Sequence, residues 1–325
     1  MLFAYQPRGS SLERVSVEAN ATVPENGVWF DLISPTKEEE QKLESALHIA
    51  VPTREEMAEI EPSSRLYIEN NVRYMTGTLI FNADTDRPKT TVVSFILAAG
   101  KLITVRYEEP QPFTRTTSKL GRGCPAGITG EGVLIEILDA IIDRSADVLE
   151  RVGTEIDVIS RRIFERGGAR DDPNQSYQAI LRGIGRKGDL TSKVRESLVS
   201  IGRLVLFFAN DADNIKLPKD QRAQIKSMAR DATSLNDHSS FLINKIQFLL
   251  DATLGMVSLE QNNVIKIFSV MAVVLLPPTL VASIYGMNFK HMPELEWIYG
   301  YPLALLLMIF VAVAPYFFFK WKRWL

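Results

Sequence analysis

The chain has 325 residues, a formal net charge of −2 and a single cysteine, Cys124. The near-neutral charge gives no sign of the basic surface that nucleic-acid-binding proteins show, and one cysteine excludes a disulfide framework within the chain. Its three histidines are too few and too scattered for a three-histidine zinc site. The N-terminus lacks the basic start and apolar run of a signal peptide, so roughly the first 200 residues should stay on the side where they are made.

Residues 1–130 are predicted to form an α+β domain, a sheet with flanking helices, on the cytoplasmic side. Val, Ile, Tyr and Phe are enriched in five segments that predict strands, at 12–17, 27–32, 72–81, 91–98 and 102–107. Helices are predicted at 35–48, which has acidic residues in its opening turns, and at 53–59. Asp84 and Asp86 fall in a turn between two of the strands, and turn chemistry alone accounts for them.

From Glu131 the spacing of apolar residues becomes helical. It predicts an antiparallel cytoplasmic helix pair within residues 131–218, made of helices at about 131–167 and 174–209. The Gly- and Pro-containing segment 167–173 should break the chain between them, and Leu217-Pro218 should end the second part.

Residues 219–285 predict one long stalk helix that continues into a membrane span, on the order of 100 Å at 1.5 Å per residue. Its apolar residues follow a 3-4 heptad spacing, typical of a coiled-coil seam, and we expect this seam to supply oligomer contacts. The seam consists of Ile225, Met228, Ala232, Leu235, Leu242, Ile246, Leu249 and Met256, with Ser239 and Thr253 in the remaining positions.

Two uncharged apolar segments follow, 18 residues at 267–284 and 22 residues at 298–319. The second can cross a hydrocarbon core of roughly 30 Å, and the first lies at the short end of that range. Lysines before the first span and the basic tail 320–325 place both termini in the cytoplasm by the positive-inside rule, with 286–297 as the outer loop. The sequence therefore predicts a multi-pass protein of the cell (inner) membrane, with the lipid bilayer as a partner.

A second row with 3-4 spacing runs along the first span, and most of its members are small or polar. It consists of Asn262, Ile265, Ser269, Ala272, Leu276, Thr279 and Ser283. Two interpretations stay open, close packing against another helix and a pore wall. Because two spans cannot enclose a channel, a pore would require a ring of subunits around the first span.

The sequence contains no phosphate-binding glycine loop, nucleophile elbow or metal-binding His-Glu helix, so we expect neither enzyme activity nor a cofactor. The distinctive motif is Tyr285-Gly286-Met287-Asn288-Phe289, which joins the two spans. Met-Pro-Glu-Leu at 292–295 and Tyr-Gly-Tyr-Pro at 299–302 follow it. With the run at 265–269, the prolines at 277–278 and the basic tail, this pattern resembles the CorA family of magnesium and cobalt channels. The match is dense over roughly residues 250–325 and weaker over the rest of the chain.

The resemblance implies a homopentamer with a cytoplasmic funnel, whose first-span helices line the pore and whose Gly-Met-Asn segments form a ring at the outer mouth. It gives Asn288 the role of selectivity residue, with Gly286 and Met287 shaping the loop. It also implies that Asn262, Leu276 and Thr279 line the pore and that Ile265 and Phe268 lie near its hydrophobic constriction.

The transported ions implied are Mg2+ and Co2+, with Ni2+ as a further candidate, and no nucleic acid or cofactor is involved. The family is thought to close when cytoplasmic Mg2+ binds between subunits. Asp231, Asp84 and Asp86 are the carboxylates that we expect could serve as this regulatory metal site. Mg2+ holds its waters tightly, so a ring of neutral amide oxygens could hydrogen-bond the hydrated ion and still release it.

One departure from the family pattern is Lys290-His291, at positions where the family commonly has an acid and an aromatic residue. Each Lys290 offsets one negative charge of the loop and should weaken the attraction of cations to the outer mouth. A zinc or nickel transporter of the same architecture is the alternative. A membrane-tethered oligomeric scaffold is the alternative from another class, and it would explain the heptads but not the Gly-Met-Asn motif.

Overall fold

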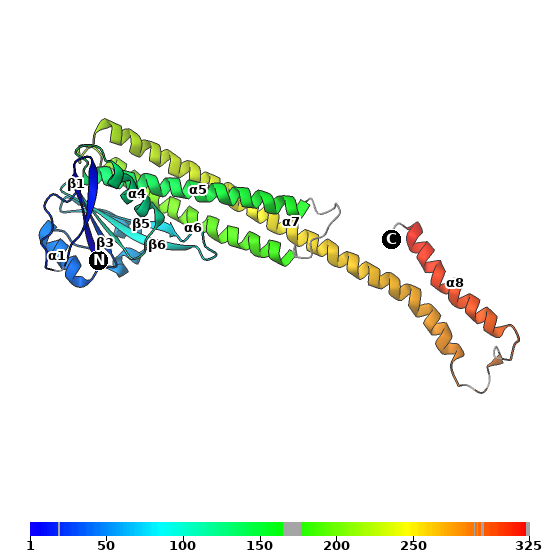
Figure 1. The fold of residues 1–325 in the computed structure, drawn as a ribbon. Coiled ribbons are helices and arrows are strands. Elements are labelled where there is room, and N and C mark those ends of the chain that lie inside the picture. Colours follow the sequence, from blue (N-terminus) through cyan, green and yellow to red (C-terminus); the bar gives the residue numbers. More distant parts are fainter. Residues whose placement is uncertain (19, 165–176, 289, 291, 294–295, 323–325) are drawn as a thin grey trace. The chain divides into compact units, whose positions relative to one another are not determined.

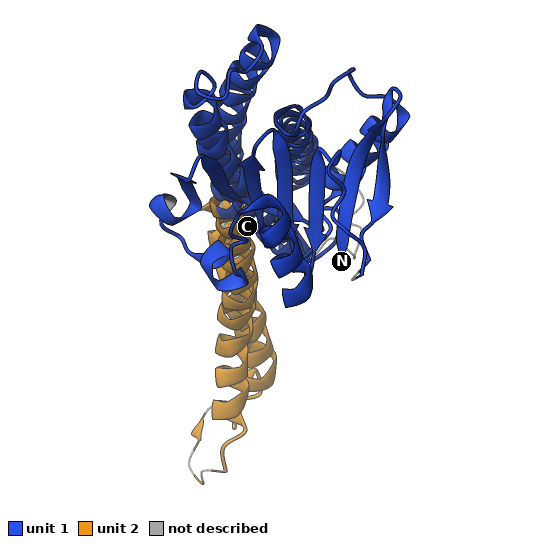
Figure 2. Ribbon diagram, turned by 90° about the vertical axis from the view of Figure 1, so that its left-hand side faces the viewer, with its two compact units in different colours: residues 1–250 blue, residues 251–325 orange. Residues whose placement is uncertain are grey.

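The structure is a computed structural model, and it divides into two compact units, residues 1–250 and 251–325 (Figure 2). It describes residues 1–18, 20–164, 177–288, 290, 292–293 and 296–322.

The first unit contains one mixed, seven-stranded sheet in the order β2-β1-β3-β7-β6-β5-β4 (Figure 1). Only β3 and β7 pair in parallel, with Asp31 opposite Thr104, and the other neighbours are antiparallel. The strands are β1 (Leu2–Arg8), β2 (Ser11–Ser16), β3 (Trp29–Ile33), β4 (Leu66–Glu69), β5 (Val72–Phe81), β6 (Lys89–Ala98) and β7 (Lys101–Arg106).

The five predicted strands correspond to β2, β3, β5, β6 and β7, with ends shifted by at most two residues. Their Val- and Ile-rich segments suit a buried sheet, and β3 is buried at every position. β1 and β4 were not predicted. The latter has four half-buried or exposed residues, too few for a pattern of alternation to show.

Three short helices, α1 (Lys37–Leu47), α2 (Arg54–Ala58) and α3 (Pro62–Arg65), follow β3 in the chain. α1 and α2 each begin with a capping box, formed by Thr36 with Glu39 and by Thr53 with Glu56. Leu43 and Met57 lie in a buried cluster with side chains from β1, β3, β6 and β7, so these helices cover one face of the sheet.

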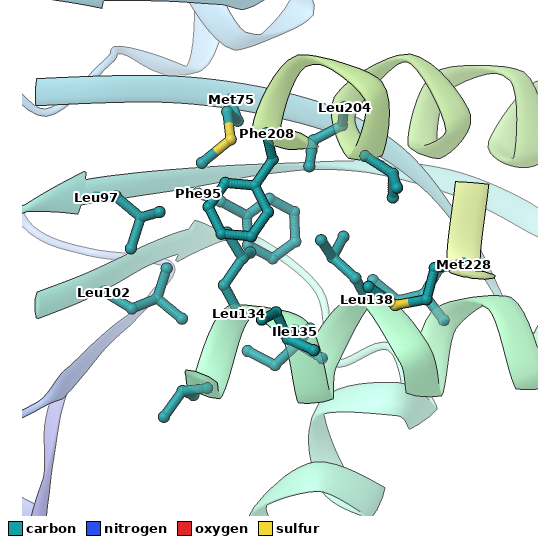
Figure 3. Packing of buried hydrophobic residues seen from close by; sticks show 14 of the residues in the cluster. Met75, Phe95, Leu97, Leu102, Leu134, Ile135, Leu138, Leu204, Phe208 and Met228 are labelled. Carbon is teal, nitrogen blue, oxygen red and sulfur yellow. The ribbon is translucent and has the colours of Figure 1, made fainter. Parts of the chain in front are cut away.

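The other face packs against α4 (Gln111–Arg122), α5 (Gly130–Phe164), α6 (Tyr177–Asn210) and the start of α7 (Lys219–Tyr285). Figure 3 shows the layer in which Met75, Phe95 and Leu97 of the sheet meet Leu138 of α5 and Phe208 of α6. Sheet and α6 approach so closely at Gly77 that a Cβ there would lie 2.9 Å from Ile201 Cδ1. The predicted break at 167–173 lies outside the described residues.

α4 was not predicted, because its segment is rich in Thr and Ser, which are weak helix formers. It forms because Phe113, Thr116 and Leu120, spaced three and four residues apart, are buried on one side of the helix. Tertiary packing therefore decides this helix, and local propensity does not.

The prediction that residues 219–285 form a single helix is confirmed by α7, but the role given to its heptad seam was wrong. In the first unit, Ala232 and Leu242 are each 2 % exposed because the chain's own helices cover them. A Cβ at Gly202 of α6 would lie 3.8 Å from Ala232 Cβ, and one at Gly153 of α5 would lie 3.8 Å from Leu242 Cδ2. The seam therefore closes a bundle within one chain and is not free to bind a second copy.

The second unit contains the rest of α7 and α8 (Gly300–Trp321). Two helices of the described chain, α7 and α8, are long and apolar enough to cross a membrane, with mean hydropathies of 2.2 and 2.3 in their most apolar windows. No residue of the α7 window is buried, and Ala304 is the buried residue of α8. Side chains that are apolar and exposed on all sides are what lipid or further subunits would cover.

Candidate functional site: the Gly-Met-Asn turn and the first span

The Gly-Met-Asn segment is the point at which α7 ends. The Gly286 N–H still donates to the carbonyl of Ala282 at 3.0 Å, as in an α-helix. The Met287 N–H donates instead to the carbonyl of Ile284 at 3.3 Å, three residues back, so the last turn tightens. Asn288 follows immediately after this turn, and its side chain is exposed.

The backbone at Gly286 leaves little room for a side chain. A Cβ on this residue would lie 3.1 Å from the carbonyl oxygen of Ala282, closer than most carbon–oxygen contacts in proteins. Glycine avoids this close contact, and Asn288 lies three residues past the end of α7 at Tyr285.

Lys290 and Glu296 are exposed in the loop between α7 and α8, and Phe289, His291, Glu294 and Leu295 lie outside the described residues. Lys290 is two residues from Asn288 in the chain, so a positive charge lies near the proposed selectivity residue. Glu294, one of the acidic residues whose charge Lys290 is predicted to offset, lies outside the described residues.

The small and polar row of the first span is exposed along its length, from Asn262 to Ser283. Two hydroxyl groups in it bond to their own helix: Thr279 Oγ1 donates to the Leu275 carbonyl, and Ser283 Oγ donates to the Thr279 carbonyl, each at 2.8 Å. Their hydrogens are thereby used, and their oxygens face outward as acceptors only, which suits a cation or its water shell.

Pro277 and Pro278 lie inside α7, about two turns before its end at Tyr285. Neither has a backbone N–H, so the carbonyls four residues earlier, those of Val273 and Val274, lack their helical donors. In a hydrocarbon environment such carbonyls need other partners, and a water-filled lumen or a neighbouring helix would provide them.

The residues assigned to the hydrophobic constriction are largely exposed in this unit. Ile265, Phe268 and Leu276 are 61 %, 64 % and 66 % exposed. Asn262, Ile265 and Ser269 also line a groove of about 530 Å³ whose other side is Phe319 of α8. The structure thus brings the predicted pore residues of α7 onto one exposed helix face.

The three proposed sensor carboxylates lie in two places. Asp84 and Asp86 share the turn between β5 and β6, as predicted. Asp84 accepts hydrogen bonds from Arg144 Nη2 at 2.6 Å and from Arg151, and Asp86 accepts one from Arg186 at 2.8 Å. The hydrogen bonds from Arg144 and Arg151 lower the pKa of Asp84, so this carboxyl is ionised at neutral pH.

Asp231 lies on the solvent side of α7, where Ser227 Oγ is 3.5 Å from its Oδ2. Across the described part of the chain, no group of three or more His, Cys, Asp or Glu residues is placed to hold a metal ion. A regulatory metal site that uses Asp231, Asp84 or Asp86 stays a prediction. The arginine partners of Asp84 and Asp86 were not predicted, because they are 60 or more residues away from their carboxylates and carry no local signal.

The profile of the family described as CorA-like Mg2+ transporter protein matches residues 24–323. The chain is 35 % identical, over 325 residues and all of both chains, to the magnesium transport protein CorA of Escherichia coli K12. The chain belongs to the CorA-like Mg2+ transporter family. The CorA of Salmonella typhimurium is 34 % identical, again over the whole of both chains.

Solved structures show the same fold. The CorA magnesium transporter of Methanocaldococcus jannaschii matches with a TM-score of 0.76 and 17 % identity, over 100 % of this chain and 99 % of that one. The full-length CmaX protein matches with a TM-score of 0.68 and 16 % identity, over 99 % and 97 % of the two chains. The fold of the CorA family therefore extends over the sheet, the bundle and both apolar helices.

Proposed function

We propose that the chain is a channel for Mg2+ that assembles as a homopentamer in the cell inner membrane, with both termini in the cytoplasm. The observation that carries this proposal is the Gly-Met-Asn turn, which ends a membrane-length helix and leaves Asn288 exposed three residues beyond the end of α7. Membership of the Mg2+ transporter family and the close E. coli relative support it.

In this proposal Asn288 selects the ion at the outer mouth of the pore. Mg2+ prefers octahedral coordination and gives up its waters reluctantly, so neutral amide oxygens would hold the hydrated ion through its waters. Binding that is strong enough for entry and weak enough for release is what conduction requires. Lys290 reduces the negative potential of this loop. The Asn288 side-chain amides, and not long-range electrostatic attraction, would therefore dominate recognition of the ion.

Below the mouth, the exposed row on α7 would line the pore. Thr279 presents an oxygen whose hydrogen is already used within the helix, while Leu276 and Ile265 would form apolar constrictions that stop conduction by dewetting. An inside-negative membrane potential would drive a divalent cation inward by about 4.6 kcal/mol per 100 mV, twice the value for a single charge.

Asn288→Ala tests this proposal in liposomes that contain the purified protein. We expect Mg2+ influx to fall at least tenfold, because the ring of amide acceptors is lost. The matched control is Asn263→Ala, which removes an exposed asparagine of α7 that is outside the small and polar row. Equal influx in the two variants would remove the selectivity role and favour a membrane-tethered scaffold. Comparing Mg2+, Co2+, Ni2+ and Zn2+ in the wild type decides which ions are carried.

Closure by cytoplasmic Mg2+ is the regulatory part of the proposal, with Asp231, Asp84 and Asp86 as candidate ligands between subunits. Asp231→Ala should leave maximal influx intact and raise the internal Mg2+ concentration that half-inhibits it. Unchanged inhibition curves in all three single alanine variants would remove this assignment.

A further inference from the structure

A second pocket, far in sequence from the Gly-Met-Asn turn, lies at the open edge of β5 in the first unit. β4 pairs with β5 only from Val72 to Met75, so the rest of that edge has no neighbouring strand. The Thr78 N–H is satisfied by Ser200 Oγ of α6 at 2.9 Å. Beside this contact, the end of α3, the β4–β5 edge and α6 enclose a pocket of about 530 Å³, within the size range of small-molecule sites.

Three arginines line this pocket: Arg65 at the end of α3, and Arg195 and Arg203 on α6. Arg65 is held in place, because its Nη1 donates to Thr78 Oγ1 at 3.1 Å and its Nε donates to the Glu59 carbonyl. Its remaining N–H groups and the two α6 guanidinium groups stay available for a ligand.

The charge of the pocket is not balanced by the protein. Glu196 is the one acidic residue of the lining, and Arg195 and Arg203 form no ion pair with any described residue. The arginines near Asp84 and Asp86 differ, since each of those has a carboxylate partner. Arg195 and Arg203 are eight residues apart on one helix, so their Cα atoms are separated by about 12 Å along its axis. An anion with several charges over that length would suit them.

Apolar side chains complete the lining. Ile60 is 87 % exposed at the pocket, Val199 of α6 is 36 % exposed, and Ile243 of α7 also contributes. Ile60 and Val199 therefore expose apolar surface in this wall of the pocket. The pocket thus combines an apolar wall with guanidinium donors, which bind phosphate oxygens in pairs.

We propose that this pocket binds a nucleoside phosphate, with the phosphates on Arg65, Arg195 and Arg203 and the base against Ile60 and Val199. The ligand would sit in the first unit, between the edge of the sheet and α6. The proposal does not depend on the transport activity, because binding is measured directly.

The test is isothermal titration calorimetry of the full chain in detergent with ATP, in buffer free of divalent cations. We expect the wild type to bind ATP and Arg195→Gln/Arg203→Gln to bind it at least tenfold more weakly, about 1.4 kcal/mol of binding free energy. The matched control is Arg182→Gln, an exposed arginine of α6 outside the pocket, which should bind like the wild type. Unchanged melting temperatures would show that the exposed substitutions leave the fold intact.

Three further ligands test whether the pocket recognises the base as well as the phosphates. We expect AMP to bind more weakly than ATP, and inorganic phosphate and citrate more weakly than AMP, because they lack the base. Phosphate or citrate binding as tightly as ATP would overturn the nucleoside assignment. No ATP binding by the wild type at millimolar concentration, or equal binding by the double variant and the wild type, would overturn the proposal itself.

Discussion

Asp84→Asn is the perturbation that best separates the structural and regulatory roles of the turn between β5 and β6. Asp84 is 54 % exposed and pairs with Arg144, which is 16 % exposed, and with Arg151, which is 37 % exposed. Ion pairs this open to water contribute about 0.2–1 kcal/mol each. Because Arg144 is mostly buried and would lose its partner, we expect a destabilisation toward the upper end of the range for two such ion pairs. The full-length protein should lose about 1–2 kcal/mol of unfolding free energy.

The pH dependence follows from the sign of the pKa shift. The arginine hydrogen bonds lower the pKa of Asp84 in the folded state, below its value of about 3.9 in an unfolded chain. The stabilisation is therefore complete above about pH 4 and is lost as the pH falls through the lowered folded pKa. The difference in melting temperature between wild type and Asp84→Asn should be constant from pH 8 to about pH 5 and vanish in strong acid.

The assay is thermal unfolding in detergent across that pH range, together with Mg2+ influx at increasing internal Mg2+. The matched control is Asp213→Asn, which removes one carboxylate, 85 % exposed, from a single ion pair with Arg222. We expect the control to lose at most about 0.5 kcal/mol and to keep the wild-type inhibition curve. A wild-type melting temperature for Asp84→Asn at pH 7 would refute the stability argument, and a wild-type inhibition curve would remove Asp84 from the candidate ligands of the regulatory site.

Two further predictions concern α5. A Cβ on Gly130 would lie 2.3 Å from the backbone N of Leu102, so Gly130→Ala should destabilise the protein by about 2–3 kcal/mol in thermal unfolding. Gly185→Ala, where a Cβ would meet nothing within 4 Å, is the control and should stabilise α6. Burial and the nearby charge of Asp143 raise the pKa of Asp139, so its ionised form is costly above that raised pKa. Asp139→Asn should therefore raise the melting temperature at pH 8, with the gain shrinking as the pH falls toward about 4, and a lower melting temperature at pH 8 would contradict this.

Much of the candidate site could be predicted from the sequence because it is local. The uncharged residues of the first span, its two prolines and the Gly-Met-Asn turn all lie in one helix or at its end. Within a helix, the spacing of residues along the chain fixes their positions in space. The predicted course of α7 from 219 to 285, and the shared face of the small and polar row from Asn262 to Ser283, follow from that periodicity. The strands β5 to β7 were found for the same reason, since each is a continuous run of strand-forming residues.

Contacts between distant segments were decided only by the tertiary structure. The heptad seam of α7 looked free in the sequence, but α5 and α6 cover it, because the sheet gives all three helices one common apolar layer. Asp84 looked like an ordinary turn residue, but Arg144 and Arg151 reach it from α5. The sequence alone thus determined that α5 to α8 are helical and that α7 and α8 are apolar enough to cross a membrane, since those properties are periodic along the chain, whereas α4 depended on packing. Which faces are covered, and which charges are paired, depended on packing between residues far apart in sequence, and no local pattern encodes that.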